Sequence, residues 1–518
     1  MSRINTNVQS MIAQRVLSQN TTSLNQSLER LSTGYKINRG KDDPAGLIAS
    51  ENLRSELTST NAAINNADRA DQVMNIAEGG LQEVSGLLTN LQGLITGSAS
   101  TAGLSSSEKQ ANQLQIDSIL QTIDRISSAT SFQGTKLLNG NFDYKASSVA
   151  SGIADYKING AKFSGNSQAV NVLVTQSAQQ AGLYMSMGGS ALDLAAGTSS
   201  FTIDIAGSLG SRELTFTSGT TMSSIAAAVN TFTDITGVQA SVVASGNSNG
   251  IKLNSKDFGS SQFVSVKVVN DGGLSTTNLG FYNWNTQNFG TLNTTRVTDF
   301  GSTTAANGVH DSGQDVGATI NGISATAHGK TAQINTDFLD VQVTLDTATA
   351  QSLGNVGGSN SALQITGGGA DFQLAAQVDI AGKVSIGIGD VAIRKMGKTE
   401  TSAGGSFNYL SDIASGKALN VVDGDLTQAQ KVVTNAIDQV SSLRGRIGAF
   451  QQNTIGSTVR SLNVAAENTA AAESTIRDAD FAQETAGLTR SQILVSASTQ
   501  VLALANAAPQ SALQLLGG

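Results

Sequence analysis

The chain has 518 residues, enough for three to four domains of ordinary size, and contains 55 Gly, only 2 Pro and no Cys. Lys and Arg number 31 against 39 Asp and Glu, a net charge of −8 without a basic block, which argues against nucleic-acid binding. Without cysteine there are no disulfides, thiolate metal sites or iron–sulfur clusters, and two histidines, His310 and His328, are too few for a three-histidine zinc site. We therefore expect no cofactor and no metal, and, since no run of about 18 apolar residues occurs, no membrane insertion.

The composition changes twice along the chain. Residues 1 to about 140 have helical spacing of Leu and Ile, residues 142–397 are rich in Gly, Ser, Thr and Val with short alternating runs, and helical spacing returns from about 426. This order predicts an α+β fold, in which a long antiparallel helical bundle or coiled coil built from both chain ends carries an inserted β-rich outer region of one or two small domains.

The first arm is unusually regular. Steps of seven residues from Leu53 to Ile95 meet apolar side chains at every position except Thr60, which is typical of a helix whose seam faces a partner helix. Asp71 and Glu78 interrupt a second row. We predict one helix over residues 45–96, roughly 78 Å long at 1.5 Å per residue. Ser105 and Glu108 then form a candidate capping box before another amphipathic helix.

The C-terminal arm has the same spacing. Asp425 and Gln428 can cap a helix whose rows of apolar residues again step by seven. Three long amphipathic helices from both ends of the chain predict one antiparallel bundle. Its expected seam consists of Leu53, Met74, Leu81, Leu88, Ile95, Val433, Val440, Ile447 and Phe450.

The extreme ends repeat the pattern with little charge; the last charged residue is Arg490. Two such helices can pair with each other, but apolar surface then remains exposed. An ordinary helical hairpin packed on the bundle is one interpretation; we favour a segment that orders on joining other copies. The predicted self-assembly residues are Ile4, Val8, Met11, Leu17, Leu24, Leu28, Leu31, Phe481, Leu488, Leu494, Val495, Val501, Leu502 and Leu515.

The middle region is predicted to be a set of short strands. The expected strands include residues 201–205, 214–216, 238–242, 263–268, 341–345 and 372–380, with a short helix at 222–232. Asn159-Gly160 and Asn321-Gly322 are hairpin-turn candidates. A division between two sheet domains is expected near residue 290.

Several motifs carry a resemblance to a known family. Residues 30–46 (RLSTGYKINRGKDDPAG) resemble the N-terminal signature of bacterial flagellins, and residues 443–451 (LRGRIGAFQ) resemble the C-terminal one. Further similar stretches are 123–126 (IDRI), 132–138 (FQGTKLL), 466–468 (AEN), 474–480 (STIRDAD) and 513–516 (LQLL). The resemblance covers both arms, about half of the chain, and the middle matches only loosely.

The resemblance implies a layered filament subunit. Residues 1–44 and 475–518 are expected to form terminal coiled-coil helices of an inner core, 45–170 and 398–474 an outer helical bundle, and 171–397 surface-exposed β-rich domains. It further implies a homopolymer used for swimming, secreted without a cleaved signal to the extracellular flagellum. The implied partners are a flagellar export chaperone and the filament cap and junction proteins.

Flagellins of some bacteria are recognised by a toll-like receptor of animals. The matching stretch here contains Leu88, Asn90, Leu91, Gln92 and Leu94. Recognised members carry arginines where this chain has Asn90 and Gln92, and an acid at the next position, so the resemblance predicts weak or no recognition.

Three alternatives are open at this point. An enzyme is not expected, because no His-Glu-x-x-His motif occurs and Gly367-Gly368-Gly369 lacks the Lys-Ser/Thr of a phosphate loop. Asp379 and Asp390 are interpreted as solvated strand-edge residues. A hook–filament junction protein shares the terminal heptads, and the outer region could serve as an adhesin or carry O-linked sugars.

Overall fold

The structure is a computed structural model. It describes residues 6–516 apart from 101–102, 164, 166, 195–199, 246–247, 275–278, 285–291, 359–360 and 402–405. Among the described residues the chain forms two compact units. Unit 1 comprises Met1–Gly79, Phe372–Val384 and Arg444–Gly518, and unit 2 comprises Gly80–Asp371 and Ser385–Leu443.

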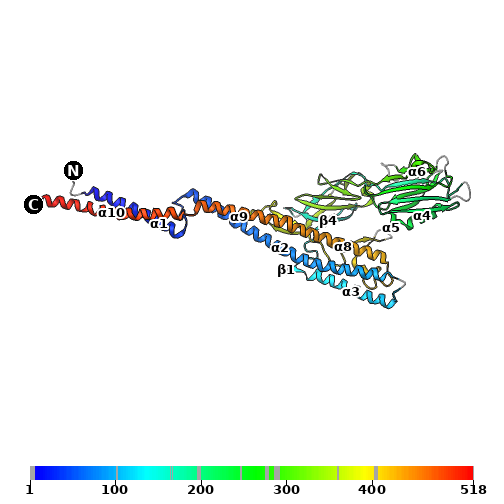
Figure 1. The fold of residues 1–518 in the computed structure, drawn as a ribbon, viewed down its shortest axis with the longest axis horizontal. Coiled ribbons are helices and arrows are strands. Elements are labelled where there is room, and N and C mark those ends of the chain that lie inside the picture. The colour runs from blue at the N-terminus through cyan, green and yellow to red at the C-terminus, as the bar shows by residue number, and fades with distance from the viewer. Residues whose placement is uncertain are drawn as a thin grey trace. The chain divides into compact units, whose positions relative to one another are not determined.

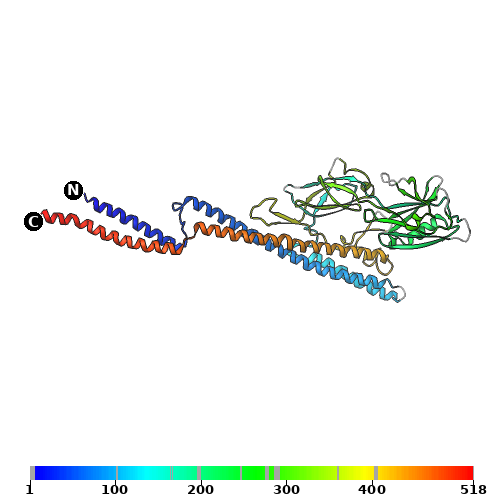
Figure 2. The ribbon, with the colours of Figure 1, turned by 45° about the horizontal axis from the view of Figure 1, so that its top comes forward.

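In unit 1, helices from the two chain ends run side by side. These are α1 (Val8–Thr33) and α10 (Phe481–Leu516), seen as the blue and red helices that end at N and C in Figures 1 and 2. The side chain of Asn7 accepts a hydrogen bond from the Ser10 N–H and caps the start of α1. Gly34, in the left-handed conformation (φ 77°), follows Thr33 and caps the end of the helix.

The long helix predicted for residues 45–96 is confirmed. It is α2 (Pro44–Ser98), 55 residues without interruption. Its start follows from local chemistry: proline occupies the first helical position, and Asp43 Oδ1 accepts a hydrogen bond from the Gly46 N–H at 3.0 Å. The C-terminal arm contains α8 (Leu426–Ala449), a six-residue π-helical segment η2 (Phe450–Ile455) and α9 (Gly456–Arg477).

Two predicted helix starts are also confirmed. Ser105 and Glu108 form both hydrogen bonds of the capping box before α3 (Ser106–Ala129). Asp425 Oδ1 accepts from the N–H groups of Thr427 and Gln428 at the start of α8. In unit 2, Gly80 of α2 lies against Thr130 and Leu138, which follow α3, and a 3₁₀ turn, η1 (Leu410–Ile413), packs on α3.

The β-rich middle contains two cores, which we call sheet domain A and sheet domain B. The core of domain A runs from Tyr144 to Ala178 and again from Val316 to Ile365, and that of domain B from Ala181 to Val309. Domain B is therefore inserted into domain A, and the chain crosses between them at residues 178–181 and 309–316. The division expected near residue 290 is wrong, because strands on both sides of it belong to the core of domain B.

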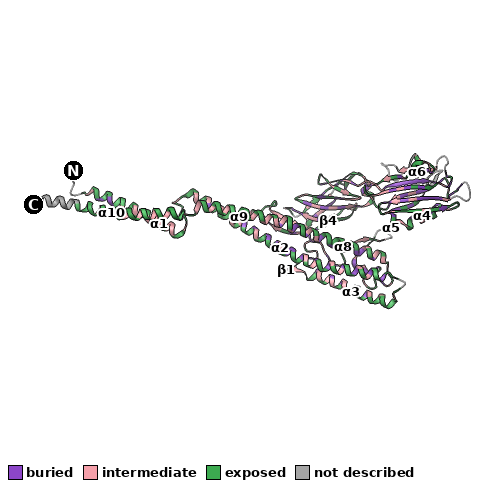
Figure 3. Ribbon diagram, in the orientation of Figure 1, coloured by how far each residue is buried: buried purple, intermediate pink, exposed green. Residues whose placement is uncertain are grey.

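Domain A holds three antiparallel sheets, in the orders β17-β16-β6-β21, β18-β19-β20-β4 and β3-β22-β5, and domain B holds two, β10-β11-β7-β13-β14 and β15-β12-β8-β9. Their buried interiors are the purple strands of Figure 3. The strands of domain A are β3 (Lys145–Ser147), β4 (Ile153–Ala161), β5 (Gln168–Val170), β6 (Val172–Gln176), β16 (Gly317–Ile320), β17 (Ile323–Ser324), β18 (Thr326–His328), β19 (Thr331–Asn335), β20 (Leu339–Leu345), β21 (Gly354–Val356) and β22 (Leu363–Gly367). Those of domain B are β7 (Gly182–Ser186), β8 (Ser200–Gly207), β9 (Ser211–Thr217), β10 (Val238–Ser245), β11 (Ser248–Ser255), β12 (Phe263–Asn270), β13 (Gly280–Trp284), β14 (Leu292–Thr298) and β15 (Val309–Ser312).

The remaining elements are short. They are the helices α4 (Met222–Thr231), α5 (Thr233–Thr236), α6 (Thr303–Asn307) and α7 (Thr347–Gln351), and the strands β1 (Ser131–Phe132), β2 (Thr135–Lys136), β23 (Ala370–Gln373), β24 (Lys383–Ile386), β25 (Thr399–Glu400) and β26 (Phe407–Asn408). The predicted helix at 222–232 corresponds to α4, and the predicted strands at 201–205 and 214–216 to the paired β8 and β9.

The two Asn-Gly pairs have different roles. Asn321 (φ 50°) and Gly322 (φ 81°) form the predicted two-residue turn between β16 and β17. The turn predicted at Asn159-Gly160 is wrong. Both residues lie inside β4, where the register against β20 shifts, and Asn159 Nδ2 donates to Asp340 Oδ1 at 3.0 Å. Here Asn-Gly marks a β-bulge.

Two further expectations differ from the structure. The strand expected at 372–380 ends at Gln373, because the Gln373 side chain donates to the carbonyls of Ala375 and Gln377 and folds the chain into a turn. Strands β3, β4 and β5 precede residue 171 and lie inside the range assigned to the outer bundle. The α+β class, with helical arms from both ends and a β-rich middle, is confirmed.

Candidate functional site: the terminal helix pair

Helices α1 and α10 form an antiparallel pair held by polar contacts at both ends. Near the chain termini, Ser10 Oγ donates to Asn506 Oδ1 at 2.7 Å. In the middle, Asn20 Nδ2 donates to Ser498 Oγ at 2.6 Å. At the other end, the Arg30 guanidinium lies 3.1 Å from Glu484 Oε1. The pair therefore has a defined alignment over more than three turns of each helix.

The predicted self-assembly residues divide between two faces of this pair. One set is half-buried: Leu17, Leu24, Leu31, Leu488, Val495 and Leu502. The other set is exposed: Val8, Met11, Leu28, Phe481, Leu494 and Val501. Ile4 lies outside the described residues, and the side chain of Leu515 does too, although its backbone continues α10.

The exposed apolar surface is larger than the sequence analysis predicted. Ile12, Val16, Ile493 and Leu504 are also exposed, the last with 73% of its surface accessible. Figure 3 shows both helices as mostly exposed or intermediate along their described length. These residues lie between the sevenfold rows, so a strict heptad reading passes over them, although they share a helical face with the predicted residues.

A short paired segment joins the terminal helices to the rest of unit 1. Tyr35 and Asp478 form an isolated antiparallel bridge, and the Lys36 N–H donates to the Arg477 carbonyl at 2.7 Å. The Arg477 guanidinium lies 4.8 Å from the centre of the Tyr35 ring and 3.0 Å from Glu51 Oε1. One arginine of the C-terminal arm thus contacts two residues of the N-terminal arm at this joint.

The predicted bundle seam lies in the interior of the two units. Met74, Leu81, Leu88, Ile95, Val433, Val440, Ile447 and Phe450 are buried, and Leu53 is half-buried. In unit 1 the seam is flanked by polar contacts that sequence reasoning missed. Glu78 Oε1 lies 2.8 Å from Arg444 Nε, and Gln451 Nε2 donates to Asp71 Oδ1 at 2.9 Å. The sequence contained a signal for these contacts. Asp71 and Glu78 are seven residues apart on the N-terminal arm, and their partners Gln451 and Arg444 are seven residues apart on the C-terminal arm.

The stretch that matches the immune-receptor motif lies on α2 in unit 2. Leu88 and Leu91 are buried, Asn90 is exposed, and Gln92 and Leu94 are half-buried. Leu88 and Leu91 therefore belong to the interior, and Asn90 offers an uncharged amide to solvent.

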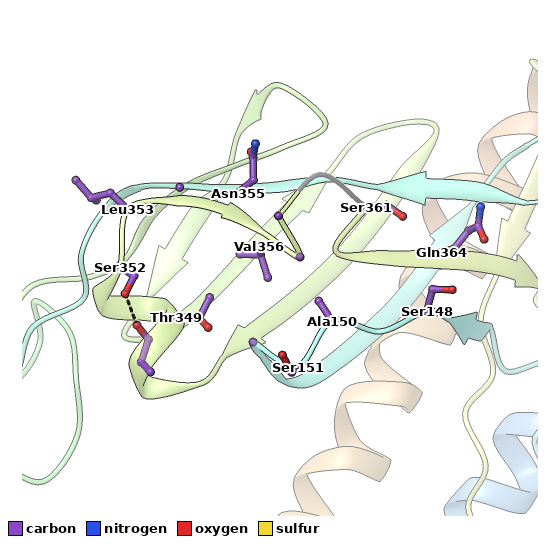
Figure 4. Close-up of a pocket in the computed structure, with 15 residues that line it drawn as sticks. Ser148, Ala150, Ser151, Thr349, Ser352, Leu353, Asn355, Val356, Ser361 and Gln364 are labelled. Carbon is purple, nitrogen blue, oxygen red and sulfur yellow. Dashed lines mark hydrogen bonds between the residues drawn. The ribbon is translucent and has the colours of Figure 1, made fainter.

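Sites for other chemistry are poorly supported. A cavity of about 940 Å³ in domain A is lined by Ser, Thr, Asn, Gln, Ala, Gly, Val and Leu residues, shown in Figure 4, with no titratable side chain among them. Within the described residues no group of three His, Asp or Glu side chains is placed to hold a metal ion. No helix in the same part of the chain combines the length and apolar character needed to cross a membrane.

The two histidines lie apart from any catalytic arrangement. The His310 ring contacts the Phe263 ring and lies 2.9 Å from Ser312 Oγ. His328 ends β18, near Asp315. Partial burial raises the pKa of Asp315, but hydrogen bonds from Ser260 and the Gly329 N–H outweigh it and hold the pKa below its ordinary value.

Comparison with known proteins agrees with this architecture. A family model described as the bacterial flagellin N-terminal helical region matches residues 4–143, and one described as the bacterial flagellin C-terminal helical region matches residues 430–516. A third, the flagellin hook IN motif, matches residues 200–257 in domain B.

Relatives align over nearly the whole chain. It is 28% identical over 521 residues to flagellin B of Vibrio cholerae serotype O1, and 28% identical over 553 residues to the B-type flagellin of Pseudomonas aeruginosa, with 99% of both chains covered in each case. The solved structure of FliC from Burkholderia pseudomallei is 16% identical, covering 74% of this chain and 99% of that one with a TM-score of 0.22. Because the flagellin models match both helical arms and flagellins align from end to end, the protein belongs to the bacterial flagellin family and is a structural subunit of the helical flagellar filament that serves motility.

Proposed function

We propose that the subunit polymerises through the exposed apolar faces of α1 and α10. The observation that carries this proposal is the row of large apolar side chains left in solvent on both helices, among them Met11, Ile493, Val501 and Leu504. A surface of this kind on paired terminal helices favours contact with other protein, since burial is worth roughly 25 cal/mol per Å² of apolar area.

The contact is heterologous, with a different surface of the next copy on the other side. A heterologous contact that does not close into a ring generates an open helical filament. In this proposal residues 1–44 and 475–518 form the inner core of the filament, residues 45–170 and 398–474 contribute its outer helical layer, and residues 171–397 face outward. The strands of domain A that precede residue 171 belong with the outward-facing part.

Substitution on the exposed face tests the proposal. We expect V501S/L504S to slow seeded filament growth at least tenfold and to raise the critical concentration, because each serine removes apolar area from the assembly contact. The control is L353S, which changes a leucine of similar exposure in domain A (69% accessible). Growth is followed by negative-stain microscopy and light scattering. Growth of V501S/L504S at the rate of L353S would contradict the proposal.

We further propose that the chain is exported to the extracellular flagellum in an unfolded state with the help of an export chaperone, and there meets the cap and junction proteins. The absence of cysteine supports this route, since no cross-link can form during passage. We assign the chain no catalytic role.

Recognition by the animal toll-like receptor is proposed to be weak. Asn90 and Gln92 offer amides where recognised members offer guanidinium groups, and charged hydrogen bonds are about twice as strong as neutral ones. We expect N90R/Q92R to raise the response of a receptor-reporter cell line well above that of the unchanged protein. A full response to the unchanged protein would contradict the proposal, and T89R, on the same helix, serves as a charge control.

A further inference from the structure

The most buried positions of the terminal helix pair are small. Among the described residues of α1 and α10, those that fall below 9% exposure are Ser10 at 8%, Ala13 at 6% and Ser498 at 7%. The leucines of the sevenfold rows are only half-buried. Two of these three most buried positions therefore carry a hydroxyl group.

Both hydroxyl groups have a partner on the opposite helix. Ser10 Oγ donates to Asn506 Oδ1 at 2.7 Å, and Ser498 Oγ accepts from Asn20 Nδ2 at 2.6 Å. Asn7 Nδ2 also donates to the Ala505 carbonyl at 2.8 Å. These hydrogen bonds link specific turns of α1 to specific turns of α10.

The apolar rows alone do not define the alignment of the two helices. Leu17, Leu24 and Leu31 repeat every seven residues, as do Leu488, Val495 and Leu502 on the opposite helix. A slip of seven residues places one leucine or valine where another was and preserves most apolar contact. The same slip separates Asn20 from Ser498, and an unpaired polar group between packed helices is unfavourable.

We propose that the Asn20–Ser498 and Ser10–Asn506 hydrogen bonds select one register of α1 against α10. Asn20 and Ser498 are positioning residues in this arrangement: they fix which turns of the two helices meet. With one register, the exposed apolar residues of α1 have a single position relative to those of α10. The inference rests on the proposed function, because a unique register matters to the filament through the surface that the pair presents.

The cysteine-free chain allows the register to be measured by cross-linking. The added Cβ of a residue at Gly487 would lie 3.8 Å from Ser27 Oγ, so S27C/G487C reports the register seen in the structure. S27C/L494C reports a slip of seven residues; because Leu494 belongs to the exposed assembly face, subunits with this pair are mixed into filaments grown mainly from the unchanged chain. Seed-grown filaments carrying either pair are oxidised and dissociated, and the intramolecular cross-link is separated from intermolecular products by mass.

Each cysteine pair is placed in three backgrounds: unchanged, N20L/S498A, and the exchanged pair N20S/S498N. We expect the unchanged chain to favour the S27C/G487C cross-link at least tenfold. The ratio of the S27C/G487C cross-link to the S27C/L494C cross-link should fall toward one in N20L/S498A, although that variant is more apolar. In N20S/S498N the ratio should rise again to about its value in the unchanged chain. A ratio in N20L/S498A equal to that of the unchanged chain would overturn the proposal.

Failure of a variant to polymerise is also informative. Filaments from N20S/S498N but not from N20L/S498A would support the proposal, because the exchanged pair restores a hydrogen-bonding hydroxyl and amide at the same two positions, whereas the apolar pair does not. If neither variant forms filaments while circular dichroism shows unchanged helix content, the hydrogen bond is not what matters and the proposal is overturned. Failure of the assembly proposal itself is seen separately, in normal growth of V501S/L504S.

Discussion

Gly46 occupies the first turn of α2, at a point where a side chain does not fit. A Cβ added there would lie 2.4 Å from Asp43 Oδ2 and 2.7 Å from Ile37 Cδ1. Asp43 caps the helix and Ile37 is buried, so the neighbours on both sides have structural roles. The backbone of Gly46 is helical, so no unusual backbone conformation requires a glycine there. Its close packing against residues of the loop between α1 and α2 explains why this position has no side chain.

This packing reverses the usual effect of adding a methyl group to a helix. We expect Gly46→Ala to destabilise the folded monomer by about 1–2 kcal/mol, because it displaces the capping carboxylate. The matched control is Gly86→Ala on the same helix, where nothing lies within 4 Å of the added Cβ; it should stabilise by up to about 1 kcal/mol. Urea unfolding followed by circular dichroism gives the change in the free energy of unfolding for both variants. Changes of the same sign would contradict the explanation.

At the scale of elements, one carboxylate contributes contacts to both sides of the crossing between domains A and B, beside the backbone bridge of Gln179 with Gln314. Asp315 Oδ1 accepts from the Ser260 N–H at 3.1 Å and the Gly329 N–H at 2.6 Å, and Asp315 Oδ2 accepts from Ser260 Oγ. Ser260 belongs to the loop before β12 in domain B, and Gly329 to the turn between β18 and β19 in domain A. The carboxylate thus links the two domains.

The lowered pKa of Asp315 gives this link a pH dependence. A carboxyl whose pKa is lower in the folded state stabilises it above the unfolded pKa, roughly 3.9, and the stabilisation is lost as the pH falls through the folded pKa. We expect Asp315→Asn to cost about 1–2 kcal/mol near neutral pH and to lose part of the acid-induced destabilisation below about pH 4. Thermal unfolding as a function of pH measures both; parallel curves for the two proteins would contradict this account.

The sequence predicted elements well where a local signal and the tertiary contacts agree. The repeat of apolar residues placed α2, and Ser105 with Glu108 placed the start of α3. Prediction failed where distant pairing decides the outcome. Asn159-Gly160 has the composition of a turn, but pairing of β4 with β20 keeps it extended. Asp71 and Glu78 interrupt an apolar row, and only the contacts to Gln451 and Arg444 explain why.

At the scale of the whole molecule, the elements are nested in chain order. Domain B is inserted into domain A, and domain A is inserted between the two helical arms. Short alternating runs predicted the existence of these sheets, but the boundaries of the insertion depend on which strands share a core. The candidate assembly surface was partly predictable, because the heptad rows identified the helices but not the exposed residues between the rows.

The central claim is that the terminal helices drive polymerisation. Negative-stain microscopy of purified protein with short filament seeds tests it most directly, with the full chain compared with a chain lacking residues 1–45 and 475–518. The account predicts long filaments from the full chain and none from the shortened one. Filaments from both would contradict it and would place the assembly contact on the remaining helices or the sheet domains.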